Sequence, residues 1–157
     1  MKIYYREKSG GIEILRCFGI ESRVEIPGMI DDKLVISAAP YAFSSHMDEK
    51  EELKNASLWE VSEGLGFGRE EHVLAGNDVE EIVFPYTLKE IGRYIFYGCG
   101  NLKKLEFSDS LMQIGCGAFT GCHALEKLTV HMRQGKKSGV KEMLGRDVAE
   151  DRCKLSL

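Results

Sequence analysis

Apolar residues return with a period of 23 positions along the second half of this chain. The segment 88–107 is followed by a close copy at 111–130, in which leucine, isoleucine, phenylalanine and cysteine recur in the same order. The recurring pairs are Leu88/Leu111, Ile91/Ile114, Phe96/Phe119, Cys99/Cys122, Leu102/Leu125 and Leu105/Leu128. A fixed period of this length is typical of a solenoid, because each unit buries its apolar face only by stacking on its neighbours.

Each unit also contains a stretch in which apolar and polar residues alternate, and this alternation predicts a strand. We expect strands at 79–85, 102–107 and 125–130. In the second of these, Leu105 and Phe107 would face the core. Lys104 and Glu106 would then face solvent, so the pattern predicts short parallel strands with one exposed face.

The first 46 residues predict a β-hairpin followed by one degenerate unit of the repeat. Strands at 2–5 and 12–18 would be joined by a turn at Gly10-Gly11, and 24–27 would form a short third strand that ends at a proline. The segment 35–43 aligns with 88–96, and His46 falls where Cys99 falls.

Residues 47–78 interrupt the period. The segment 47–56 is rich in charged helix formers and predicts a helix with Asp48 as its N-cap, whose Leu53 and Ala56 would lie on the solenoid. A loop with three alternating glycines follows at 64–68. It lacks the third spaced glycine and the following helix of a dinucleotide-binding fingerprint, so it is weak evidence for a nucleotide site.

After the last unit the repeat stops. The segment 134–139 is basic and rich in turn formers. Apolar residues at helical spacing then follow, namely Val140, Met143, Leu144, Val148 and Leu155. We expect residues 132–157 to form either a cap on the last unit or an unpacked tail, and the whole of 1–157 to be a single domain.

Composition narrows the class of partner. The net charge of −4 argues against nucleic acid, whose binding proteins carry a concentrated basic face. No apolar run reaches the roughly 18–20 residues that cross a bilayer, so we expect no membrane insertion. The first eight residues lack the apolar stretch of a signal peptide. As written, the chain is therefore expected in the cytoplasm.

The cysteines are odd in number and form no C-x-x-C motif; they are Cys17, Cys99, Cys116, Cys122 and Cys153. Cys99 and Cys122 occupy the same place in successive units, and free cysteine is among the most often buried residues. We therefore expect structural thiols, with no metal and no cofactor. His123 follows Cys122, but neighbouring residues here point to opposite sides, so a Cys–His dyad is not expected.

The two regular units resemble the BspA-type leucine-rich-repeat family, whose pattern is roughly L-x-x-I-G-x-x-A-F-x-x-C-x-x-L-x-x-I-x-I-P. The residues that fit are Leu111, Ile114, Gly115, Ala118, Phe119, Cys122, Leu125 and Leu128. The resemblance implies a bacterial interaction module without catalytic residues. Pattern and resemblance together predict an α/β protein: a right-handed leucine-rich-repeat solenoid of short parallel strands, with an N-terminal β-hairpin and a helical insertion.

A solenoid of this kind binds through exposed strand positions, which stack in columns about 4.8 Å apart. The candidate partner-binding residues are Glu81, Lys104, Lys127, Glu106, Thr129 and His131. The alternative is that Glu81 and Lys104 simply pair across strands, which contributes about 0–1 kcal/mol.

These patterns favour a non-catalytic protein–protein interaction module whose partner the sequence does not identify. One alternative is an enzyme or ligand-binding protein with a site built by the insertion 47–78, including His72 and the glycine loop. A second alternative is a fragment of a surface adhesin, because some members of the BspA-type family, which the repeat units resemble, are surface adhesins.

Overall fold

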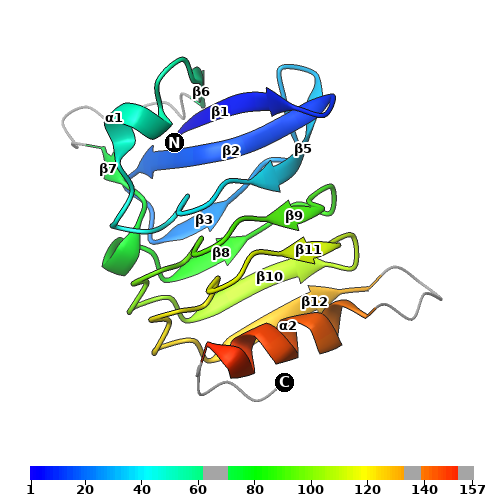
Figure 1. The fold of residues 1–157 in the computed structure, drawn as a ribbon. Coiled ribbons are helices and arrows are strands. Elements are labelled where there is room, and N and C mark those ends of the chain that lie inside the picture. Colours follow the sequence, from blue (N-terminus) through cyan, green and yellow to red (C-terminus); the bar gives the residue numbers. More distant parts are fainter. Residues whose placement is uncertain (62–70, 133–138, 152–157) are drawn as a thin grey trace.

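The computed structural model describes residues 1–61, 71–132 and 139–151. The chain winds into stacked coils, and each coil contributes a strand to each of two sheets (Figure 1). One sheet is wholly parallel, and we call it the parallel sheet; its order is β12-β10-β8-β3. Its strands are β3 (Arg23–Glu25), β8 (Glu81–Val83), β10 (Lys104–Ser108) and β12 (Lys127–His131).

The other sheet, which we call the mixed sheet, follows the order β11-β9-β5-β2-β1-β6. Its coil strands are β5 (Lys33–Ala38), β9 (Glu90–Ile91) and β11 (Gln113–Ile114), and they run parallel. It continues into β2 (Gly11–Gly19), β1 (Lys2–Lys8) and β6 (Ser57–Glu60). The short strands β4 (Met29–Ile30) and β7 (His72–Val73) pair with β5 and β2. The predicted solenoid of short parallel strands is therefore confirmed.

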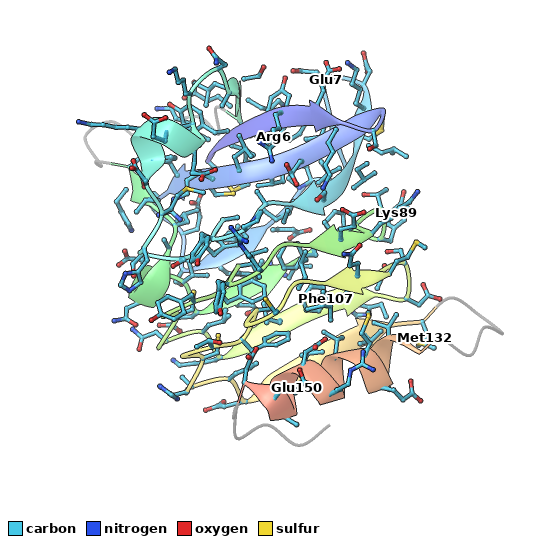
Figure 2. The ribbon with its side chains drawn as sticks, viewed as in Figure 1. Arg6, Glu7, Lys89, Phe107, Met132 and Glu150 are labelled. Atoms are coloured by element: carbon cyan, nitrogen blue, oxygen red, sulfur yellow. The ribbon has the colours of Figure 1, made fainter. Side chains whose placement is uncertain are left out.

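Ladders of identical side chains fill the space between the sheets, as the period predicts. Leu105 and Phe107 are at most 1% exposed, and Phe107 lies inside the stack (Figure 2). Phe43, Phe96 and Phe119 follow one another through successive coils, with ring centroids 6.1 Å and 5.8 Å apart. A single coil would leave its phenylalanine ring exposed to solvent, so the coils are stabilised by stacking on one another.

The N-terminal hairpin is confirmed, and its turn has the geometry that the strand twist requires. Ser9 and Gly10 both have positive φ, 49° and 79°, which is the two-residue turn that joins twisted antiparallel strands. β2 also pairs with β5 in parallel, so the hairpin extends the mixed sheet past the first coil.

The degenerate unit at 35–43 is a complete coil. Ala38 pairs with Ile91 in the mixed sheet. The thiol of Cys99 donates to the carbonyl oxygen of Phe43 at 3.2 Å, as the thiol of Cys122 donates to that of Phe96 at 3.4 Å. His46, which aligns with Cys99, is instead exposed.

The described part of the insertion contains one helical turn and two strands. α1 spans Glu49–Glu52, and Asp48 is its N-cap residue without a side-chain cap bond. Beyond α1 the chain forms β6, because the edge of β1 offers hydrogen-bond partners to its backbone. Trp59 pairs with Ile3 there and packs on the core. The glycine loop at 64–68 lies outside the described residues, and a 3₁₀ turn at Gly76–Asp78 leads back into the coils.

The helix α2 (Val140–Glu150) lies across the last coil, beside β11 and β12 (Figure 1). Val140, Leu144 and Val148 are buried against that coil, in keeping with their helical spacing. The basic segment before the helix and the residues after 151 lie outside the described part.

Side chains complete the backbone ladder at both ends of the stack. Between coils the bonds run in one direction, from Phe43 N to Ile95 O and from Phe96 N to Ala118 O. After the last coil, the carboxylate of Asp151 accepts from Phe119 N at 2.8 Å and from the hydroxyl of Thr120 at 3.2 Å. Before the first coil, the guanidinium of Arg16 donates to the carbonyl oxygens of Ala42 and Ser44. An acceptor thus closes one end of the ladder and a donor closes the other.

Candidate functional site

The exposed face of the parallel sheet carries the six candidate residues, and the strand register places them in columns. β3 adds a fourth strand that the sequence did not place beside the others. The first column is Arg23, Glu81, Lys104 and Lys127, and the second is Glu25, Val83, Glu106 and Thr129. Ser108 pairs with His131 in the next position.

Glu81 and Lys104 are neighbours across the strands, but among the described residues they form no ion pair, which was the alternative to a binding role. Its carboxylate instead lies 3.3 Å from the guanidinium of Arg23, which also bonds Glu25 at 3.0 Å. The hydrogen bonds that Arg23 donates to Glu25 and, to a lesser extent, to Glu81 raise the pKa of Arg23 above its ordinary value. The alternation at 23–27 could have revealed Arg23, had the third strand been aligned with the repeat.

Lys104 and Lys127 are adjacent on neighbouring strands, and both are exposed. Within residues 1–61, 71–132 and 139–151, no carboxylate lies within 4.0 Å of either ammonium group. By contrast, Lys103 bonds Glu80 at 3.1 Å one residue away. Like charges that face each other across strands are unfavourable, so this pair is a local source of unbalanced positive charge.

Glu106 and His131 form the other side of the face. The carboxylate of Glu106 lies 2.7 Å from Nε2 of His131, whose side chain is 64% exposed. Thr129 is the direct neighbour of Glu106 across the strands and is half-buried. The six candidates therefore share one face, with a basic pair at the start of the strands and an acid–histidine pair at their end.

A cavity of about 830 Å³ opens beside this face, at the edge of β3. Arg23 and Glu25 line one side, and His131 lies at its far end. Trp59 and Val61, which belong to the insertion, line the other side. No sequence pattern marked Trp59 as part of a site, because it reaches the cavity only through the pairing of β6 with β1.

The four described cysteines divide into buried and exposed groups, and Cys153 lies outside the described residues. Burial raises the pKa of Cys17 and of Cys99 to about 12, so both thiols stay protonated at neutral pH. Cys122 is also buried. Cys116 is exposed, so the expectation of a buried structural thiol is wrong there. It lies outside the repeating position, on a turn where the side chain faces solvent.

The insertion lines the cavity through Trp59 and Val61, and its glycine loop lies outside the described residues. His72 pairs with Gly19 at the end of β2 and is not among the residues that line the cavity. Among the described residues there is no group of three or more histidine, cysteine or acidic side chains that could hold a metal ion. None of the helices in the same residues is long and apolar enough to cross a membrane.

Comparison with known proteins agrees with this architecture. Residues 70–138 match a family model described as a BspA type leucine rich repeat region of 6 copies. A search of curated proteins found no match.

Two solved structures are similar to the chain. One is a leucine rich cell surface protein from Faecalibacterium prausnitzii, with a TM-score of 0.54 and 19% identity over 82% of this chain. This chain spans 30% of that protein's length. The other is a leucine rich repeat protein from T. pallidum, with a TM-score of 0.40 and 16% identity over 98% of this chain and 95% of that one. The resemblance to the BspA-type leucine-rich-repeat family is therefore confirmed over residues 70–138.

Proposed function

We propose that this protein is a non-catalytic protein-binding module that holds a protein partner against the exposed face of the parallel sheet. The observation that supports the proposal is the adjacent pair Lys104 and Lys127, exposed and without a carboxylate partner in the described residues. The other charged residues of the same columns have partners of opposite charge or a histidine within 3.3 Å; they are Arg23, Glu25, Glu81 and Glu106.

Two neighbouring lysines on a rigid sheet cost a few tenths of a kcal/mol relative to neutral neighbours. An acidic segment of a partner would remove that repulsion and gain charge-assisted hydrogen bonds. Glu106, Thr129 and His131 would then contribute polar contacts at the rim, where charged groups set specificity and association rate more than affinity.

The test is affinity capture from the source cell with the intact protein and two matched double variants. Lys104→Glu with Lys127→Glu reverses the basic pair. Lys54→Glu with Lys141→Glu makes the same change in net charge at exposed positions of the insertion and α2. We expect the first variant to lose partners that both the wild type and the second variant retain. An unchanged set of partners in the first variant would contradict the proposal.

The cytoplasmic location expected from the sequence is part of this proposal. Protease treatment of intact source cells, followed by detection of the protein, separates it from the adhesin alternative. Protection from protease supports a cytoplasmic module, whereas digestion at the surface favours the adhesin.

A further inference from the structure

Two tyrosines stack on one another where the chain leaves the mixed sheet. Tyr41 follows β5 in the first coil, and Tyr94 follows β9 in the second. Their ring centroids lie 5.6 Å apart and their planes differ by 22°. This separation falls within the roughly 4.5–7 Å of direct aromatic contact. Both residues are half-buried, so the stack lies at the surface of the molecule.

The backbone of both tyrosines has a conformation that favours glycine. The φ angles are 60° at Tyr41 and 51° at Tyr94, and Gly117 has 66° at the equivalent position of the next coil. This left-handed region costs free energy for a residue with a Cβ, because the Cβ approaches the following carbonyl oxygen. Glycine would therefore be the less costly residue in all three coils. Tyrosine at two of them is an outlier of the kind that supports a functional role for the side chains.

Gly117 leaves the space that the ring of Tyr94 occupies. A Cβ added to Gly117 would lie 2.2 Å from Cε1 of Tyr94. Backbone bonds hold the three loops in register, from Tyr41 N to Arg93 O at 3.2 Å and from Tyr94 N to Cys116 O at 3.0 Å. The ring of Tyr94 is thus held between the loop of Gly117 and the ring of Tyr41.

The phenol groups of the stack are accessible to an oxidant. Among the described residues, the hydroxyls of Tyr41 and Tyr94 have no hydrogen-bond partner. No side-chain oxygen in that part of the chain is buried without a partner, so both hydroxyls reach solvent. A phenol in contact with solvent can give up one electron and one proton to a one-electron oxidant, which leaves a radical spread over the ring.

We propose that Tyr41 and Tyr94 are an oxidative modification site, at which a haem peroxidase with hydrogen peroxide joins the two rings by a carbon–carbon bond. Each phenol loses one electron and one proton, and the two radicals couple at ring carbons next to the oxygen-bearing carbons. One hydrogen then moves from each of these carbons to its oxygen, which restores both phenols. Hydrogen peroxide takes up the two electrons and two protons and leaves as two molecules of water.

The new bond would span the interruption of the repeat. The insertion 47–78 lies between the two tyrosines in the sequence, so the bond closes a loop of chain that contains all of it. A covalent link across a long loop removes conformational freedom from the unfolded chain. The first coil would thereby be fixed to the second. This inference does not rest on the binding proposed for the parallel sheet, because neither tyrosine belongs to that sheet.

The test is oxidation of the purified full-length protein, in dilute solution, by a haem peroxidase with hydrogen peroxide. After trypsin digestion Tyr41 lies in the peptide 34–50 and Tyr94 in the peptide 94–103. We expect these two peptides joined, at their summed mass less two hydrogens, in a fraction that shows dityrosine fluorescence. Fragment ions then separate Tyr94 from Tyr97, which lies in the same peptide and whose ring stands at 86° to that of Tyr94.

Conservative variants show whether the stack directs the reaction. Tyr41→Phe and Tyr94→Phe each keep an aromatic ring but remove the phenol that forms the radical, so we expect the joined peptides to be lost. Tyr86→Phe is the matched control, because Tyr86 is 68% exposed and would be the better substrate if access alone decided. We expect the joined peptides to persist in this control. Thermal unfolding confirms that each variant is folded.

Urea unfolding measures what the bond does to the fold. We expect the joined protein to unfold at a higher urea concentration than the untreated protein, because the unfolded chain is constrained. Tyr41→Phe after the same oxidation is the control for damage to other side chains, and its midpoint should not rise.

Four results would overturn the proposal. One is the absence of the joined peptides from the oxidised folded protein, including the case in which Tyr94 couples to Tyr97 instead. Another is their persistence in Tyr41→Phe. A third is an equal yield when the protein is oxidised in urea, because the folded stack would then not direct the coupling. The last is an unchanged urea midpoint of the joined protein, because the bond would then not fix the first coil to the second.

Discussion

Replacing Arg16 with methionine should destabilise the protein far more than breaking its ion pair. The side chain is 1% exposed, and its guanidinium donates to the carbonyl oxygens of Ala42 and Ser44 in the first coil. No other donor to these two oxygens is seen among the described residues. A methionine side chain would fill much of the same space, but it has no N–H with which to replace the lost donors.

The magnitude follows from two opposing effects. A buried acceptor without a partner costs about 1–3 kcal/mol, so two such carbonyls cost about 2–6 kcal/mol. Removing a buried charge also relieves its desolvation, which lowers the pKa of Arg16 in the folded protein. The net loss should therefore be about 3 kcal/mol, which is a large part of the roughly 5–15 kcal/mol that stabilises a typical domain.

The assay is urea unfolding of Arg16→Met beside the matched control Glu49→Gln. Glu49 lies 3.2 Å from the guanidinium, but its side chain is 40% exposed. Loss of this pair should therefore change the free energy of unfolding by less than about 1 kcal/mol. Equal effects of the two substitutions, or a loss below about 1 kcal/mol for Arg16→Met, would refute the view that Arg16 caps the backbone ladder.

Three further predictions concern the other end of the ladder, a buried carboxylate and the thiols. Asp151→Ala should lower the free energy of unfolding by about 1–2 kcal/mol and speed hydrogen exchange at Phe119 N, whose acceptor it removes; exchange as slow as in the wild type would contradict the capping role. Burial would raise the pKa of Glu13, but hydrogen bonds from lysine and arginine neighbours lower it on balance. A lowered folded pKa gives stability that is present above the unfolded value of about 4.3 and is lost as pH falls through the folded value, so the stability gap between wild type and Glu13→Gln should be full at pH 7 and shrink below about pH 4. Alkylation of the native protein should fall by one rapidly reacting thiol in Cys116→Ser and by none in Cys99→Ser, as counted by mass spectrometry.

The buried residues of the coils could be predicted from the repeat, because equivalent apolar positions in successive units pack in the same surroundings. Leu105 and Leu128 stack in register, as their separation of 23 residues requires. The candidate residues on the exposed face follow from the same register. The degenerate coil at 35–43 was also predictable, since Ala42 and Phe43 keep the small and aromatic pattern of Ala118 and Phe119.

The positions outside the repeat depend on tertiary pairing that no local pattern encodes. Arg16 sits in an alternating strand, where a charged residue ordinarily faces solvent. It is buried because β2 passes over the loop of the first coil, whose carbonyl oxygens have no preceding coil to donate to them. Ser57–Glu60 follows a segment of helix formers, yet it becomes a strand because the edge of β1 is available.

The interruption of the repeat, more than the repeat itself, gives this solenoid its individual surface. Arg16 and Asp151 close the backbone ladder at its two ends, and α2 covers the last coil, so the ends offer little for a partner to bind. The hairpin and β6 lengthen the mixed sheet, whereas β3 pairs only with β8 in the part of the chain that the structure describes. Because Trp59 and Val61 of the insertion line the cavity together with Arg23 and Glu25 of β3, the insertion shapes a groove beside the coils that the repeat alone would not form.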